Sequence, residues 1–409
     1  MPMRLYTLTS DLHGELAKSA HNEQFIKDIE AAIGATFDYR ESDFSDFGAI
    51  GDIIYVRTGG TEGIFRQLFE GHEGARVRLL TSGQSNSLAA SMEIISWLNQ
   101  QGLGGEIIHG SVKEIASDLL KYYPPVGHIS SKLIHPFVDP GVLEGKRYGV
   151  VGQPSDWLIS SAVDYEKARE LLGATLVDIP IEELVALASA ADGGGSRALA
   201  ARGVVKGSDE QNGGPYGREL TDEDFDGSER IYQALKQIIA KYKLDGLTLR
   251  CFDLLSALHN TGCLSLARLN AEGYVATCEG DIPAMLSMAV VRKRRAVSGF
   301  QANLSRIEGN KFLFAHCTVP LDMVSDYCYD THFESGIGVA IHGILPAGKA
   351  RLFKISADLE HCIDVPIEIT DNPYGPNLCR TQVQIKGSAE LRRYCLGSPL
   401  GNHHIIVPE

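Results

Sequence analysis

Two carboxylates, Glu279 and Asp281, stand close together in the segment 278–283 (CEGDIP), directly after an apolar run. Proline is favoured in the first turn of a helix, so the segment predicts a helix over Ala284 to Val291. Acidic side chains between a strand and a helix can bind a cation or a polar substrate. They can also cap the positive end of the helix, and the spacing alone favours this second interpretation.

A third acid, Asp253, also follows an apolar, strand-like run, here Leu244 to Arg250. It precedes Glu279 by 26 residues, which leaves room for one helix between two neighbouring parallel strands. Both acids would then meet at one edge of the sheet. Like charges repel at short range unless a cation or a shared proton compensates, so this arrangement favours a functional role for the pair.

The last part of the chain offers further polar side chains that could bind a metal or a substrate. A single histidine is more often structural than a ligand. The segment 401–405 (GNHHI) reads as a polar loop, however, and its Asn-His-His run is hard to explain as core. The candidates in this part are His316, His332, Glu334, Asn402, His403 and His404.

A polar loop at 82–87 follows the strand-like run 77–81 and contains Ser85 and Asn86. Its small side chains leave backbone N–H groups and hydroxyls open to a polar ligand, although an ordinary loop with a serine helix cap explains it equally well. The chain has no glycine-rich nucleotide fingerprint at this position.

The elements that must position these residues alternate between strand and helix in the first two thirds of the chain, which predicts parallel sheets covered by helices. After residue 295 helical spacing becomes rare, and short apolar runs separated by Gly and Pro predict an antiparallel, barrel-like unit. We therefore expect an α/β protein with two parallel-sheet domains, 1–146 and 147–295, and a C-terminal β domain, 296–409. Within the first domain, Leu88 to Leu98 reads as an amphipathic helix, and within the second, Asn212 to Gly217 reads as a loop near an insertion.

Composition restricts the classes of partner. The 409 residues carry a formal net charge of -14, which argues against a general nucleic-acid or anionic-membrane surface. No signal-peptide core and no run of 18 apolar residues are present, so no membrane span is expected. All eight cysteines occur at or after Cys251 without a C-x-x-C pair, which favours buried reduced thiols in a cytoplasmic protein over a disulfide framework.

In order along the chain, these motifs resemble the L-fucose and L-arabinose isomerase superfamily. The acids at 253 and 278–281, the segment 315–317 (AHC) and the terminal 401–403 (GNH) carry the resemblance. The segments 151–158 (VGQPSDWL) and 85–90 (SNSLAA) are similar to its shorter, fucose isomerase-like branch.

The resemblance implies two Rossmann-like domains, a β domain, and interconversion of aldoses and ketoses with a divalent cation, usually Mn²⁺, with Mg²⁺ or Co²⁺ as alternatives. It carries the metal ligands to Asp253, to Glu279 or Asp281, and to His403, with His404 as the alternative to His403; Asn402 matches a substrate contact. It also implies a homo-oligomer, a trimer or hexamer, with active sites near subunit interfaces. Asp253 stands where the longer enzymes have Glu, so the ligand geometry can differ.

The chemistry suits this set of residues. Hard oxygen ligands with one imidazole favour Mn²⁺ or Mg²⁺ over a thiolate zinc site, so Cys251 and Cys278 read as packing residues. Asp253 and Glu279 could also exchange protons with an unphosphorylated sugar through an enediolate. A sugar-binding or regulatory protein on the same fold and a sugar epimerase are the alternative functions.

Overall fold

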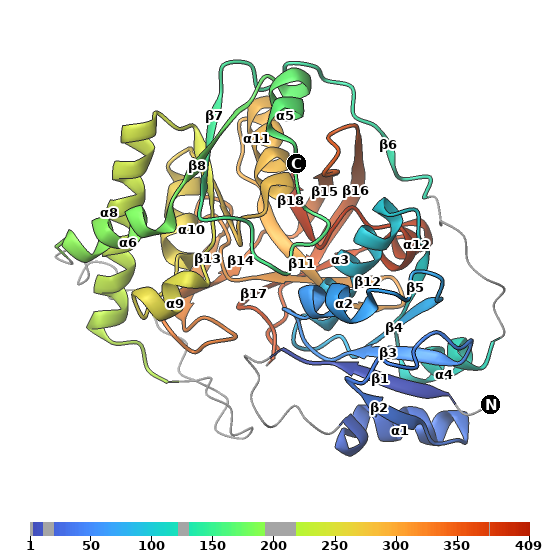
Figure 1. Ribbon diagram of the computed structural model, residues 1–409. Helices are drawn as coiled ribbons and strands as arrows, with labels where there is room; N and C mark the ends of the chain where they lie inside the picture. Colours follow the sequence, from blue (N-terminus) through green and yellow to red (C-terminus); the bar gives the residue numbers. More distant parts are fainter. Residues whose placement is uncertain (1–2, 11–19, 122–130, 193–217, 376) are drawn as a thin grey trace.

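The computed structural model describes residues 3–10, 20–121, 131–192, 218–375 and 377–409. These residues form two parallel sheets, a closed antiparallel barrel and a small hairpin (Figure 1). The expected fold class is therefore confirmed. The expected loop at Asn212 to Gly217 lies outside the described residues.

The first sheet has five parallel strands in the order β2-β1-β3-β4-β5. The sequence pattern did not predict the edge strand β2 or the helix α2. The reason is that β2 carries mostly polar residues and α2 is only eight residues long. The strands are β1 (Arg4–Leu8), β2 (Asp38–Glu41), β3 (Asp52–Val56), β4 (Val77–Thr81) and β5 (Gly105–Ile108). The helices are α1 (Gln24–Ile33), α2 (Glu62–Phe69), α3 (Ser87–Gln100) and α4 (Val112–Leu120), with a 3-10 turn η3 (Ala20–Asn22) ahead of α1.

The second sheet has four parallel strands in the order β10-β9-β7-β8. The expectation that the strands before the two acidic segments are neighbours is confirmed, because β9 and β10 pair directly. The strands are β7 (Arg147–Val151), β8 (Thr175–Ile179), β9 (Gly246–Leu249) and β10 (Val275–Cys278). The helices are α5 (Tyr165–Leu172), α6 (Ile181–Ala190), α8 (Asp222–Tyr242), α9 (Asp253–Ala257), α10 (Cys263–Ala271) and α11 (Ile282–Arg295).

Six antiparallel strands close into the barrel in the order β15-β18-β11-β12-β17-β16, and β15 pairs with β16. The short strand β6 (His135–Pro136) extends β16 although it precedes the second sheet in sequence. The barrel strands are β11 (Phe300–Glu308), β12 (Lys311–His316), β15 (Gly348–Ile355), β16 (His361–Asp371), β17 (Thr381–Lys386) and β18 (His403–Pro408). The hairpin β13 (Asp326–Asp330) and β14 (Ala340–Ile344) and the helix α12 (Ala389–Gly397) accompany it.

The barrel register fixes which side chains face the rest of the molecule. Asn303 of β11 pairs with His403 of β18 on one side and with Ala315 of β12 on the other. Successive residues in a strand point to opposite faces, so His403 and His404 point in opposite directions. The expectation of a polar loop at 401–405 is wrong, because β18 begins at His403.

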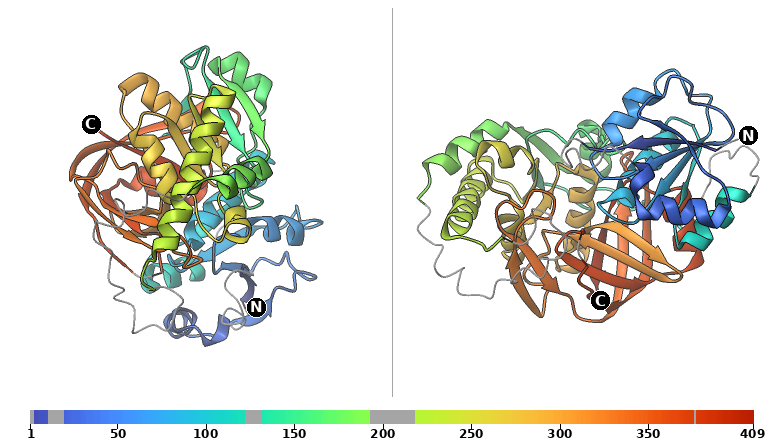
Figure 2. Two further views of the ribbon diagram at one scale, coloured as in Figure 1. Left: turned by 90° about the vertical axis from the view of Figure 1, so that its left-hand side faces the viewer. Right: turned by 90° about the horizontal axis from the view of Figure 1, so that it is seen from below.

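Helix α3 joins the first sheet to the barrel. It packs on β3, β4 and β5 and also on β11, and Figure 2 shows the barrel strands beside both α/β units. Residues 87–96 of α3 are all buried. The expected amphipathic helix is therefore a helix without a solvent face, since the barrel covers the side that an isolated sheet would leave open.

The proposed division into 1–146, 147–295 and 296–409 follows the three sheets, except that β6 belongs to the barrel; these boundaries stay a prediction. In the described part of the chain, no helix combines the length and the apolar character required to cross a bilayer.

Candidate metal and sugar site

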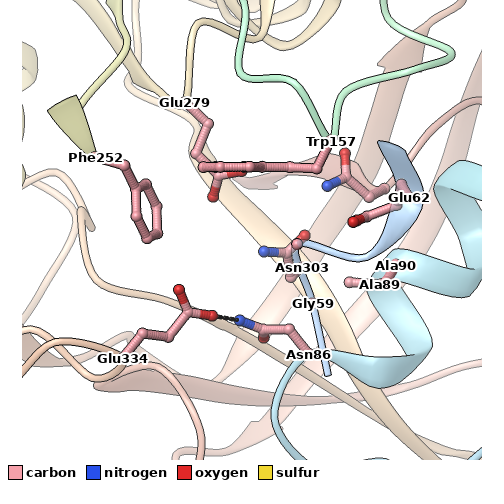
Figure 3. Close-up of a pocket in the computed structure, with 12 residues that line it drawn as sticks. Gly59, Glu62, Asn86, Ala89, Ala90, Trp157, Phe252, Glu279, Asn303 and Glu334 are labelled. Carbon is pink, nitrogen blue, oxygen red and sulfur yellow. Dashed lines mark hydrogen bonds between the residues drawn. The ribbon is translucent and has the colours of Figure 1, made fainter. Parts of the chain in front are cut away.

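A pocket of about 420 Å³, including its opening to solvent, lies where the two sheets meet the barrel (Figure 3). Its walls come from loops of the first sheet, from the ends of strands in the second sheet, and from the barrel. The residues that line it are Gly59, Gly60, Glu62, Asn86, Ala89, Ala90, Trp157, Phe252, Glu279, Asn303, Glu334 and Asn402.

Glu279 follows β10 and has a φ of 66°, in the left-handed region that residues other than glycine rarely occupy. Trp157 donates a hydrogen bond from Nε1 to Oε2 of Glu279 over 2.7 Å. Gly280 is also left-handed, and a Cβ there would come within 2.7 Å of the Cα of Pro154. Such backbone strain persists where the surroundings hold it, commonly at functional sites.

His403 lies beside Glu279 and is completely buried. Its Nδ1 is 2.9 Å from Oδ2 of Asp281, and its Nε2 is 3.4 Å from Oε1 of Glu279. This Nε2 has no hydrogen-bond partner among the described residues. Burial disfavours the charged ring, but the Glu279 and Asp281 carboxylates outweigh it and raise the pKa of His403 to about 9.

Asp281 has a structural as well as an electrostatic role. It is the N-cap of α11, and its Oδ1 accepts a hydrogen bond from the backbone N–H of Ala284 over 2.6 Å. The capping interpretation is therefore confirmed for this acid. Its Oδ2 faces His403 and lies 3.5 Å from Nζ of the buried Lys354. Burial opposes ionisation, yet Lys354 and His403 keep the pKa of Asp281 below its ordinary value.

His316 completes a compact group at the pocket wall. It ends β12, its Nδ1 lies 2.9 Å from Oγ1 of Thr318, and its Nε2 lies 3.6 Å from Oε1 of Glu279. One ligand atom each from Glu279, His316 and His403 fall within 4.8 Å of one another. Burial opposes the charge on Glu279, but His403 and His316 hold the pKa of that carboxyl well below its usual range.

This group fits a divalent cation. Both histidines place Nε2 toward the same carboxylate oxygen, while Nδ1 of each contacts another polar side chain, an arrangement that orients imidazole ligands in metal sites. Nε2 of His403 makes no hydrogen bond in the described part of the chain, so it can serve as a donor atom for a metal once the ring has lost its proton. A second acidic group, Asp358, Glu360 and His361, is mostly exposed, and Glu360 is paired with Lys167.

The structure does not bring Asp253 into this group. Asp253 is the first residue of α9, its side chain is 40 % exposed, and its Oδ1 pairs with Nε of Arg250 over 3.0 Å. Arg250 also binds Asp156. The neighbouring strands thus do not place the two acids on a common centre, because the helix that starts at Asp253 directs its carboxylate to the arginine.

The other sequence candidates divide between the pocket and its surroundings. Asn402, Asn86 and Glu334 line the pocket, and Asn86 donates a hydrogen bond from Nδ2 to Oε1 of Glu334 over 2.7 Å. Burial raises the pKa of Glu334 to about 7, with the Glu279 charge adding to the effect. His332 is not among the lining residues, but its ring contacts that of Phe252 edge to face.

Ser85 and His404 are not among the residues that line the pocket. The Ser85 backbone bridges two loops, since its carbonyl accepts from Gly59 and its N–H donates to Asn377. His404 points away from His403, its Nε2 lies 2.7 Å from the Tyr394 hydroxyl, and its Nδ1 contacts the Asn402 carbonyl. Both ring nitrogens of His404 are thus engaged outside the group that fits a metal.

Sequence reasoning missed several residues at this site. Glu62 follows the segment 58–61 (TGGT) after β3, so its place at the carboxyl end of a parallel strand was a usable signal. Glu93 gave none, because it sits inside an apolar helix and reaches its partners through long-range packing: it accepts from the backbone N–H groups of Ser160 and Asn402. Trp157, Phe252 and Asn303 also line the pocket.

The predicted packing role agrees with the surroundings of Cys251 and Cys278. Both thiols are buried in an apolar cluster of the second sheet, their sulfur atoms are 2.8 Å apart, and all eight cysteines are free.

Comparison with known proteins relates the chain distantly to sugar isomerases. The sulfoquinovose isomerases of Priestia aryabhattai and Priestia megaterium are each 25 % identical to it over 230 residues. The match covers 51 % of this chain and 47 % of each relative, so it spans about half the length of the curated relatives. No family model matches the chain.

Proposed function

We propose that the protein is a metal-dependent aldose–ketose isomerase that acts on an unphosphorylated sugar in the pocket at Glu279. The observation that supports this most directly is the group of Glu279, His316 and His403, in which Nε2 of His403 makes no hydrogen bond to a described residue and Glu279 lines the pocket. The relationship to sulfoquinovose isomerases supports the same reaction class.

Glu279, His316 and His403 would hold the metal, with Mn²⁺ as the first candidate and Mg²⁺ or Co²⁺ as alternatives. When bound, a divalent cation acts as a Lewis acid that makes the C–H group beside a carbonyl more acidic and stabilises an enediolate. Asp281 orients His403 through Nδ1 and balances the charge of its ring. Asn402 and Asn303 then supply amide groups for sugar hydroxyls.

Glu334 is the proposed acid–base group, in place of the partnership between Asp253 and Glu279. It faces Glu279 across the pocket (Figure 3), and its pKa of about 7 suits a group that both accepts and returns a proton near neutral pH. It takes the proton from C2 of the open-chain aldose and returns it to C1, while the hydroxyl proton on O2 moves to O1. Asn86 holds its carboxyl in place.

The pocket favours a neutral sugar over the sulfonated sugar of the relatives. None of the described residues that line it is a lysine or an arginine, whereas three are glutamates. A buried sulfonate or phosphate needs a cationic partner, and carboxylates would repel it. We therefore propose L-fucose, L-arabinose or a related pentose or 6-deoxyhexose as the substrate class.

Two alternatives use the same pocket. A sugar-binding or regulatory protein would bind sugar without turnover, and an epimerase would return the proton to C2 from the other face. The strained backbone of Glu279 and the group that fits a metal favour an enzyme, because binding alone does not need either. A cytoplasmic location, a homo-trimer or hexamer, and the absence of nucleic-acid and membrane partners stay predictions.

The test is an assay of metal-stripped protein with added Mn²⁺ on neutral pentoses, 6-deoxyhexoses and sulfoquinovose. We expect ketose to form from one or more neutral aldoses, no reaction after chelation, and recovery with Mn²⁺. Full activity without metal would refute the metal site, a C2 epimer as the product would establish the epimerase, and binding without any product would establish the binding protein. A preference for sulfoquinovose would refute the substrate class.

A further inference from the structure

Glu62 is a buried acid at the pocket that the proposed reaction does not use. It is the first residue of α2, directly after the loop 58–61, and it is only 2 % exposed. Its Oε2 has no hydrogen-bond partner among the described residues. Figure 3 shows its carboxyl directed into the pocket, toward Asn303.

The surroundings of Glu62 hold it in this position. A Cβ on Gly59 would come within 2.9 Å of the Cβ of Asn86, so the loop before Glu62 packs tightly on the wall of the pocket. A Cβ on Gly63, the next residue, would meet the carbonyl oxygen of Asp156 at 3.2 Å. With both flanks packed, the backbone that carries Glu62 has little room to shift away from the pocket.

A helix-start acid is the simplest alternative, because a negative charge near the first turn complements the helix dipole. An exposed carboxylate performs that task without being desolvated. Here burial is the largest effect and raises the pKa of Glu62 well above its ordinary value. The nearby charges of Glu93 and Glu279 raise this pKa further, whereas hydrogen bonds from the backbone N–H groups of Glu62 and Thr61 lower it. A protonated carboxyl can donate one hydrogen bond and accept others, as a sugar hydroxyl requires.

We propose that Glu62 determines substrate specificity by binding one hydroxyl group of the sugar, away from the carbons that react. This inference rests on the proposed function. A sugar lacking that hydroxyl would leave the buried Oε2 unpartnered, and sites built in this way reject such analogues strongly. Glu62 thus selects the sugar, whereas Glu279, His316, His403 and Glu334 serve the reaction.

The experiment compares the best neutral aldose of the panel with its 3-, 4-, 5- and 6-deoxy analogues, where each exists. For the wild type we expect one analogue to lose at least about 100-fold in kcat/KM. In Glu62→Leu this discrimination should fall below about tenfold, because the variant has no polar atom at this position. The change should come from a lower kcat/KM for the sugar that carries the hydroxyl. Glu62→Gln retains a donor and an acceptor and should keep most of the discrimination. Glu70→Gln, an exposed glutamate after the end of the same helix, is the matched control.

A second measurement separates substrate recognition from a structural role. If Glu62 is a binding residue, Glu62→Leu should leave the Tm of the sugar-free protein unchanged or raise it, since a buried unpartnered carboxyl is removed. A lower Tm with unchanged discrimination would overturn the inference and leave the isomerase proposal intact. If the wild type converts no aldose, the isomerase proposal fails instead. Calorimetric sugar binding then decides for Glu62: weaker binding in Glu62→Leu supports the inference, and equal or undetectable binding in both proteins overturns it.

Discussion

Glu279 combines three features that are individually uncommon: a left-handed backbone, a carboxylate that is only 12 % exposed, and contacts to two imidazoles. Glu279→Gln keeps the shape and the Trp157 contact but removes the charge. We expect it to lose bound Mn²⁺ and at least about 100-fold in kcat, because the amide is a weaker ligand and the loss belongs to the reaction step.

Asp253→Asn is the matched control for that variant. Asp253 is paired with Arg250 at the surface, so the substitution should retain bound metal and most of the activity. Metal content by mass spectrometry and kinetics on the same samples provide the comparison. Loss of metal in Asp253→Asn, with retention in Glu279→Gln, would reverse the assignment of the ligand.

Metal binding should depend on pH through His403. In the metal-free protein its pKa is about 9, so the ring is protonated at neutral pH and must lose a proton before Nε2 can bind a metal. The apparent Mn²⁺ affinity should therefore rise by up to about tenfold per pH unit between pH 6 and 8. Titration calorimetry in buffers of different ionisation enthalpy measures the released proton. An affinity independent of pH would contradict this prediction.

Glu334 should make the free energy of unfolding of the metal-free protein fall as the pH rises, because its pKa is raised on folding. Its pKa rises from 4.5 to about 7 on folding, so the folded state holds a proton that the unfolded state releases between these values. The associated stability is complete below about pH 4.5 and is lost as the pH rises through 7, by at most about 1.4 kcal/mol per pH unit. Glu334→Gln should reduce this slope in urea-unfolding midpoints measured between pH 5 and 6.5, below the range in which the raised pKa of His403 adds a slope of the same sign. An unchanged slope would exclude Glu334 as its source.

At the scale of single elements, α11 depends on the acid that begins it. Asp281→Asn should destabilise the protein by about 3–5 kcal/mol, because it leaves the buried Lys354 without its carboxylate, while the asparagine oxygen can still cap the helix. Lys354→Met should cost less, and the double variant should recover part of the loss. Urea unfolding of the metal-free single and double variants measures the coupling. Strictly additive losses would show that the two side chains do not interact.

The elements also show what the sequence could and could not establish. The run of apolar residues before Glu279, and the neighbouring strand before Asp253, were predictable from local pattern, and β9 and β10 do pair. The direction of the Asp253 side chain could not be predicted in this way, because the first turn of a five-residue helix decides where its carboxylate points. Local pattern also could not separate a loop from a strand at His403, since its β-sheet partners lie about a hundred residues earlier, on β11.

Burial of α3 escaped prediction for a related reason. Its sequence carries Ser87 and Ser91 on one face and Glu93 on nearly the opposite face, but all three are buried, and Glu93 binds backbone N–H groups of two distant loops. Periodicity describes what one helix presents to its surroundings, and it does not describe how many neighbours the fold supplies. The pocket was therefore the hardest feature to predict, because residues near all three sheets form its walls.

At the scale of the whole molecule, the largest apolar cluster joins the first sheet, α3 and the barrel. A smaller cluster joins α11 and the second sheet to the barrel strands β15 and β18, and another lies within the second sheet and its helices. We therefore expect the first sheet and the barrel to unfold together. Leu98→Ala in α3 should destabilise both by about 2–5 kcal/mol, with matching increases in amide exchange in β4 and β12.

Leu235→Ala in α8 is the matched control, because this leucine is equally buried but belongs to the cluster of the second sheet. It should accelerate amide exchange in β9 more than in β4. Equal acceleration in all three strands for both variants would show that the molecule unfolds as one unit instead of two.

The register of β18 has a consequence for how this gene can change over time. His403 and His404 are adjacent and point to opposite faces of the barrel sheet. The pairing of His403 with Asn303 of β11 sets this register. Deleting or inserting one residue at the start of β18 would exchange the two imidazoles between the pocket and the Tyr394 side, and a closed barrel has no free edge at which to absorb the shift. Lineages can therefore alter this strand by point substitution, whereas changes in its length are open to them only in pairs of residues.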